Sequence, residues 1–238
     1  MPLWSNSNYT PTPSLHEAVI TSLENFDEND AALGQARNAF STATELLKKI
    51  SDARDPLARD TSKTDGQKLL IMAGVTEKQA DRAARAFDNA AKSLKSLIQT
   101  LDESLNKPLE QTTHTALCQE IRSYVRGLPK DKREAFVNDA VKRGDMQVMQ
   151  SVLGAPSYLS EISDERKTIW LRQYREKADP VAVQRLSLYR AALERVTQNA
   201  PLIHAEFEKA MGGKWSDVRR LRNQVSASDA ALAALRLE

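Results

Sequence analysis

Histidine and cysteine are the side chains of this sequence best suited to metal or nucleophile chemistry, and they are scarce. Three histidines and one cysteine occur in the 238 residues. His114 and Cys118 stand four residues apart, a spacing that two metal ligands on one helix face could use. No third or fourth ligand follows in a recognisable pattern, and no orienting group for a cysteine–histidine pair is identifiable. We therefore predict no metal site, no cofactor and no catalytic residue.

Neighbouring carboxylates are the second candidate for chemistry. Asp102 and Glu103 form one pair, and Glu161 lies close to Asp164 and Glu165. We expect both groups at helix ends, where acidic side chains complement the helix dipole. The sequence has no glycine-rich phosphate loop, no G-x-S-x-G and no H-E-x-x-H. The prediction is a non-enzymatic protein, with an enzyme of unfamiliar type as one alternative.

A short basic cluster near the C-terminal end could contact phosphates. Arg219, Arg220 and Arg222 follow Trp215, and arginine with an aromatic ring is a combination that nucleic-acid binding uses. The whole chain is nearly neutral, with 34 basic and 32 acidic residues, so its net charge does not favour nucleic acid. The cluster is also explained by a solvated helix face or an acidic protein partner. A nucleic-acid-associated helical protein is therefore the second alternative.

Composition favours helices throughout. Glycine, proline and aromatic residues are few, which is typical of an all-α protein. A single cysteine excludes an intrachain disulfide. No apolar run is long enough for a transmembrane helix, and no signal peptide is visible, so we expect no membrane partner and a cytoplasmic setting.

Apolar residues at seven-residue spacing predict a first long helix over residues 14–53. Ser14 and Glu17 match a capping box at its start. A polar connector over residues 54–65 would reverse the chain. The stripe consists of Val19, Phe26, Leu33, Phe40 and Leu47.

A second long helix is expected over residues 66–105, interrupted at Gly74 and restarted by a second capping box at Thr76. Its stripe includes Phe87. Residues 14–109 would thus form a long antiparallel helical hairpin, whose apolar stripes another copy of the chain could complete.

The remaining segments are expected to be shorter or broken. Residues 110–162 are predicted to form a small helical module, with breaks near Pro129 and Gly144. Residues 163–213 are predicted to form a long helix kinked at Pro180 and Pro201, or capped at Asp179 with Pro180 as its first helical residue. Residues 214–238 would form a hinged C-terminal helix. The expected fold is all-α and elongated.

The first 13 residues contain three prolines and cannot form a helix. One interpretation is a disordered tail. The other is an extended arm that docks Leu3, Trp4 and Tyr9 into a pocket on its own body or on a neighbouring subunit. As protein-interaction residues we select Leu3, Trp4, Tyr9, Phe26, Phe40 and Phe87.

Residues 144–166 carry the sequence Val-Leu-Gly-Ala-Pro-x-x-Leu-Ser, from Val152 to Ser160. This segment resembles helical proteins from the structural regions of tailed bacteriophages and prophages, most of them uncharacterised. The resemblance implies a virion component assembled in the host cytoplasm, with other copies of itself or other virion proteins as partners. Together with the helical stripes, it predicts a structural assembly protein.

Overall fold

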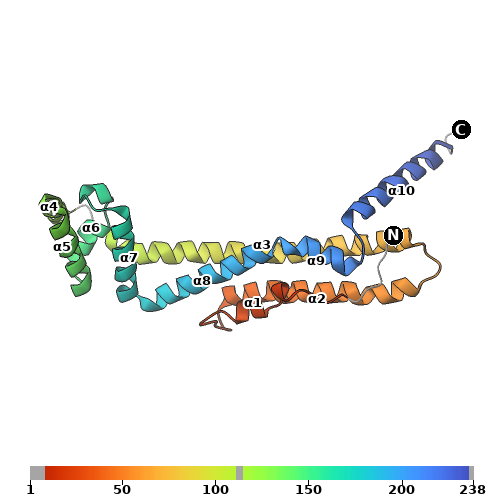
Figure 1. Ribbon diagram of the computed structural model, residues 1–238, viewed down its shortest axis with the longest axis horizontal. Helices are drawn as coiled ribbons and strands as arrows, with labels where there is room; N and C mark the ends of the chain where they lie inside the picture. The colour runs from red at the N-terminus through yellow and green to blue at the C-terminus, as the bar shows by residue number, and fades with distance from the viewer. Residues whose placement is uncertain (1–8, 111–114, 236–238) are drawn as a thin grey trace. The chain divides into compact units, whose positions relative to one another are not determined.

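The computed structural model describes residues 9–110 and 115–235, and their regular structure is entirely helical (Figure 1). The predicted all-α fold is confirmed. Residues 1–95 and 190–238 belong to one compact unit, here called the first unit, and residues 96–189 form the second unit. Within the described residues, no helix combines the length and the apolar character needed to cross a membrane.

The core of the first unit is an antiparallel pair of helices. The rings of Phe40 and Phe87 contact each other with centroids 4.6 Å apart, and nearer the connector Lys68 Nζ donates to the carbonyl of Ala58 at 2.9 Å. A third helix, α9, packs on α2. The helices of this unit are α1 (Ala18–Thr21), α2 (Ala31–Arg59), the front of α3 (Asp65–Glu110), the end of α8 (Pro180–Asn199), α9 (Leu202–Met211) and α10 (Trp215–Leu235), preceded by the 3-10 helix η1 (Pro13–Leu15).

The first long helix begins later than predicted. Ser14 lies inside η1, which Thr12 caps, and the chain makes a short α1 and a turn before α2 starts at Ala31. In this turn Asn25 adopts a left-handed conformation with φ 62°. Asp30 caps α2 by accepting from the amides of Ala32 and Leu33. Short polar side chains that bond to their own backbone compete with helix formation. The part of the predicted apolar stripe before Ala31 therefore does not belong to α2.

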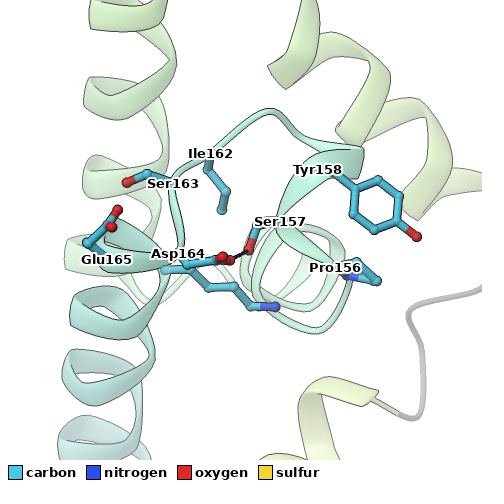
Figure 2. Close-up of a pocket in the computed structure, with 8 residues that line it drawn as sticks. Pro156, Ser157, Tyr158, Ile162, Ser163, Asp164 and Glu165 are labelled. Carbon is cyan, nitrogen blue, oxygen red and sulfur yellow. Dashed lines mark hydrogen bonds between the residues drawn. The ribbon is translucent and has the colours of Figure 1, made fainter.

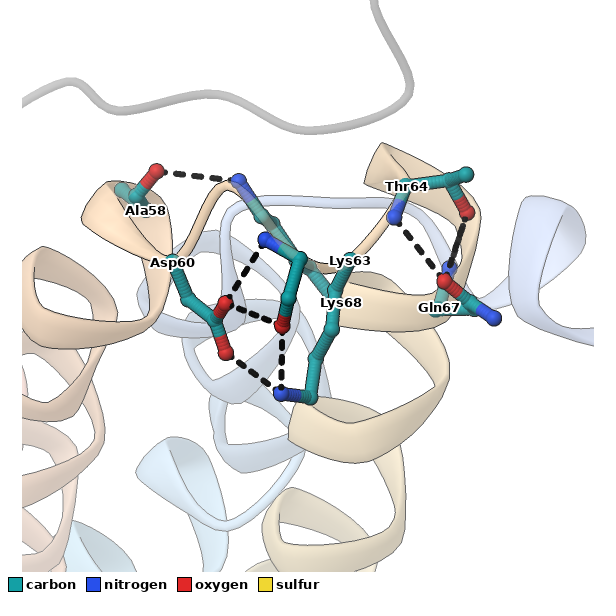
Figure 3. A network of polar contacts seen from close by, with 7 residues as sticks. Ala58, Asp60, Lys63, Thr64, Gln67 and Lys68 are labelled. Atoms are coloured by element: carbon teal, nitrogen blue, oxygen red, sulfur yellow. Dashed lines mark hydrogen bonds and ion pairs between the residues drawn. The ribbon is translucent and has the colours of Figure 1, made fainter.

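The second long helix is uninterrupted, and the predicted break at Gly74 is wrong. The chain reverses between α2 and α3 at Asp60, whose side chain accepts from Ser62 and pairs with Lys63. The capping box is formed by Thr64 and Gln67, where each side chain accepts from the backbone amide of the other (Figure 3). These bonds satisfy two amides at the start of α3.

The second unit has three short helices and α7 (Asp164–Ala178) around one apolar core. Val125, Val137 and Val152 from the three short helices are fully buried with Trp170 of α7. The chain turns where it was expected to: α5 ends at Gly144, with φ 75°, and Asp145 caps α6. The short helices are α4 (Ala116–Gly127), α5 (Lys130–Arg143) and α6 (Met146–Leu153), followed by the 3-10 helix η2 (Ser157–Leu159).

The predicted kinked helix over residues 163–213 is three separate helices, α7, α8 and α9. At the first break, Asp179 leaves helical geometry and its carboxylate accepts from the amide of Ala182 at 2.9 Å. Pro180 is the first residue of α8, the position where its missing donor costs nothing. At the second break, Pro201 precedes α9.

Candidate interaction site

The corner between α9 and α10 fixes where the terminal helix begins. Gly212 ends α9 with φ 80°, and its amide bonds back to the carbonyls of Glu208 and Lys209. The carboxylate of Glu208 then accepts from the backbone amide of Trp215, the first residue of α10, at 2.9 Å. A Cβ at Gly212 would lie 2.7 Å from the guanidinium of Arg54, which is 2 % exposed. Only glycine fits both the backbone angle and the space.

The base of α10 lies on α3. Val218 is buried, and Leu221 packs over Gly66, where an added Cβ would lie 3.4 Å from the leucine methyl. Arg222 donates two hydrogen bonds to the carboxylate of Glu77, at 2.7 and 2.8 Å. Beside this contact is a groove of about 460 Å³. Its lining residues are Glu77, Ala80, Asp81, His204, Trp215, Val218, Arg219, Arg222 and Asn223.

Two of the charged residues that line this groove, Glu77 and Arg222, pair with each other. The hydrogen bonds from Arg222 hold the pKa of Glu77 below its ordinary value, and those same bonds raise the pKa of Arg222. Arg220 pairs with Asp217 at 3.0 Å. Of the predicted basic cluster, Arg219 and Arg222 line the groove, and both side chains are exposed. Arg222 therefore holds the base of α10 on α3, whereas the ion pair of Arg220 lies within α10.

The outer part of α10, residues 223–234, is exposed to solvent. Every described side chain over residues 223–234 is exposed, including Val225 at 47 % and Leu232 at 54 %. Val225 and Leu232 continue the row that begins with Leu221, because spacings of four and seven residues return to one helix face. The described part of α10 therefore packs on α3 at its N-terminal end and is exposed to solvent over the rest of its length.

Tyr9 docks on its own chain. Its hydroxyl donates to Glu206 Oε2 of α9 at 2.5 Å, and Lys209 donates to the other oxygen of that carboxylate at 2.6 Å. Burial and the bond to Glu206 raise the pKa of Tyr9. Burial opposes ionisation of Glu206, but the bonds from Lys209 and Tyr9 outweigh it, so the pKa of Glu206 lies below its ordinary value.

The other predicted interaction residues are not gathered at this site. Leu3 and Trp4 lie outside the described residues. Phe26 is half-buried in the turn after α1. Phe40 and Phe87 are both buried against each other between α2 and α3. This corrects the expectation that another copy covers them, since residues from α2 and α3 of one chain supply the contact.

A second cavity, of about 560 Å³, lies in the second unit near the end of the segment over residues 144–166. Ser157 donates to Asp164 Oδ1 at 2.5 Å, and Lys167 donates to the carbonyl of Ala155 at 2.6 Å. Figure 2 shows the Tyr158 ring on the opposite side of this hollow from Glu165. These two hydrogen bonds therefore join the start of α7 to the turn before it.

Two of the carboxylates first considered for chemistry form ion pairs within the chain. Asp102, which lies within α3 and not at its end, pairs with Arg175 at 3.3 Å. Glu161 pairs with Arg133 at 2.9 Å. Cys118 is buried, and His114 lies outside the described residues. In the described ranges no group of three His, Cys, Asp or Glu is placed to hold a metal.

Arg133 is an important residue that the sequence interpretation missed. Its guanidinium donates to the carbonyls of Val125, Arg126 and Leu128 at the end of α4, and to the carbonyl and carboxylate of Glu161. Glu161 has φ 51°, a conformation uncommon outside glycine. A cation on the last carbonyls of a helix is favourable, but no local pattern marks Arg133 for this role.

Fold and site together define an all-α protein in which every described side chain over residues 223–234 of α10 is exposed. Comparisons with protein-family models, curated protein sequences and solved structures find no match to the chain.

Proposed function

We propose that this chain is a non-enzymatic structural protein that assembles with copies of itself, as a component of a tailed-bacteriophage particle built in the host cytoplasm. The observation that carries the proposal is the outer half of α10, which is helical while every described side chain over residues 223–234 is exposed. An isolated helix shorter than about 12–15 residues is marginal in water. A second molecule that covers one face would stabilise it.

Further support comes from apolar side chains left exposed in both units. In the first unit they include Ile71, Val75, Val225 and Leu232; in the second unit, Leu117 and Tyr124 lie exposed on α4. Tyr124 packs edge-on against Phe136 with centroids 5.4 Å apart, so its ring is held in one orientation. Apolar side chains that share one exposed helix face, as Ile71 and Val75 do, are candidates for a protein interface.

The place of assembly is proposed from the segment over residues 144–166. Its likeness to helical proteins of bacteriophage structural regions is the reason for choosing a virion over another assembly. In this chain the segment contributes α6 and the turn that leads into α7. It supplies packing residues such as Val152 and Leu153, which suits a structural part.

Two experiments test the proposal. Light scattering of the full chain over a wide concentration range is expected to give a mass that rises from monomer to oligomer. Mass spectrometry of gradient-purified particles from the producing cells is expected to detect the chain in the particle band. A protein that stays monomeric and is absent from particles would refute the proposal.

The nucleic-acid alternative has its own readout. It requires DNA binding that weakens steeply with salt and is lost when Arg219, Arg220 and Arg222 are changed to Ala. Two of these arginines already pair with carboxylates of the same chain. A Glu77→Gln control separates the two roles of Arg222, because it removes the ion pair while leaving the arginine available to phosphate.

A further inference from the structure

The outer face of α3 in the first unit presents a second set of exposed apolar side chains. Ile71 is 45 % exposed and Val75 is 51 % exposed. Together with Lys78 they share one helix face, since they are spaced by four and then three residues. A hollow of about 390 Å³, lined by Lys63, Gln67, Leu70 and Ile71 among others, continues this face towards the connector.

Gly74 makes this face flat. It lies beside Ile71 and Val75, and a Cβ built there would meet nothing within 4 Å. A glycine between exposed apolar side chains lets a second helix approach the backbone of α3 closely. The face therefore suits a partner helix whose contacting side chains are mostly small.

The outer half of α10 has that character. It is rich in alanine, and Asp229 is the only charged residue over 223–235. Val225, Asp229 and Leu232 share one face by the same spacing of four and three residues. This gives the helix two apolar side chains with an acid between them, opposite a face that carries two apolar side chains and a base.

One antiparallel register pairs Asp229 with Lys78 and gives both Val225 and Leu232 a partner on α3. Val75 and Lys78 are three residues apart, and so are Asp229 and Leu232. Placing Asp229 beside Lys78 therefore places Leu232 over Val75. The next step of four residues then brings Val225 onto the aliphatic part of Arg82, because the two helices have the same rise per residue.

The α10 helix of the same chain cannot make this contact. Its base is held against Gly66 and Glu77 of α3, and the helix then runs on with residues 223–234 exposed. An unbroken helix does not fold back on the element from which it departs. We infer that α10 of one copy docks on the Ile71–Val75–Lys78 face of α3 in a second copy, in a reciprocal exchange of terminal helices.

This inference rests on the proposed self-assembly and names the surface that would carry it. In a two-fold dimer each copy would present both surfaces, so each docking contact would occur twice. The charge pair offers a direct test of register. Lys78→Glu and Asp229→Lys should each weaken dimerisation of the full chain by about threefold to tenfold, and the double variant should restore it.

A steric test compares two helical glycines that have similar surroundings within one chain. Gly74 and Gly34 both lie inside helices with open space where a Cβ would be. Gly74→Leu should weaken dimerisation by at least about tenfold because it fills the docking face. Gly34→Leu should leave dimerisation unchanged. Helix content and melting of both variants show that neither result comes from misfolding.

Sedimentation equilibrium of the full chain and these variants separates failure of the docking face from failure of self-assembly. If the wild-type chain dimerises but Gly74→Leu has no effect and the charge double variant restores nothing, the docking face is wrong while self-assembly stands. If the wild-type chain is monomeric at all concentrations, self-assembly and the docking face both fail. Restoration by the double variant together with loss in Gly74→Leu is the result that the geometry requires.

Discussion

Replacing Gly212 with alanine should destabilise the first unit far more than the same change at Gly144 destabilises the second. Both glycines end a helix with positive φ, 80° and 75°. An alanine in the left-handed region costs about 1–2 kcal/mol. At Gly144 the added Cβ meets nothing within 4 Å, so that cost is the whole expected effect.

At Gly212 the added Cβ would lie 2.7 Å from the guanidinium of Arg54. That distance forces a buried cation out of its place, and disturbing a buried polar group costs a further 1–3 kcal/mol or so. We therefore expect Gly212→Ala to lower the free energy of unfolding by roughly 2–5 kcal/mol.

Hydrogen exchange read by mass spectrometry is the suitable assay, since it reports opening of the two units separately. The amides of α2 and α9 should lose protection in Gly212→Ala, and those of α5 and α6 in Gly144→Ala. In an Arg54→Ala background the extra cost of Gly212→Ala should disappear. Equal costs at the two glycines, or an extra cost that persists without Arg54, would refute the reasoning.

Three other changes test the contacts described above. Thr64→Ala removes one side of the capping box of α3 and should cost about 1 kcal/mol in urea unfolding, whereas Thr61→Ala should change little. Tyr9→Phe should also cost about 1 kcal/mol at neutral pH. Because the pKa of Tyr9 is raised above its ordinary 10.0, this contribution should be complete below pH 10 and lost as the pH rises further, and a difference between wild type and Tyr9→Phe that does not shrink there would contradict it. Arg133→Met leaves several backbone carbonyls without their donor and should cost roughly 2–4 kcal/mol, whereas Arg172→Met, which breaks an exposed pair with Glu176, should stay within about 0.5 kcal/mol.

Sequence patterns predicted the helices best where the chain carries strong breaking signals. The break predicted near Gly144 lies between α5 and α6, because a left-handed glycine and an aspartate cap are local features. The capping boxes were assigned wrongly, at Ser14 and Thr76 and not at Thr64. All three match the same short pattern, and packing decides between them: Thr76 is fully buried inside α3.

The division into two units could not be predicted from sequence. The first unit combines residues up to Lys95 with residues from Arg190 onwards, and no periodicity links stretches so far apart. The contacts of the candidate site could not be predicted from the sequence either. The basic cluster at Arg219, Arg220 and Arg222 was visible in the sequence, but its anchor Glu77 lies 145 positions away from Arg222.

The sequence predicts that a second molecule covers the apolar stripes, but the chain itself covers part of them. Phe40 and Phe87 show that much of the stripe of α2 and α3 is satisfied within the chain. What remains exposed is smaller and lies elsewhere, at Ile71 and Val75 on α3 and at Val225 and Leu232 on α10. Part of what α2 packs against is α9, a helix far away in the sequence.

Amide exchange along α10, measured at several protein concentrations beside the molecular mass, tests the central claim most directly. The account predicts that amides over residues 223–235 exchange rapidly in the dilute monomer and gain protection over the same concentration range in which the mass doubles. Protection that is already complete in the monomer, or exchange that stays rapid in the oligomer, would contradict the assignment of α10 as the docking element.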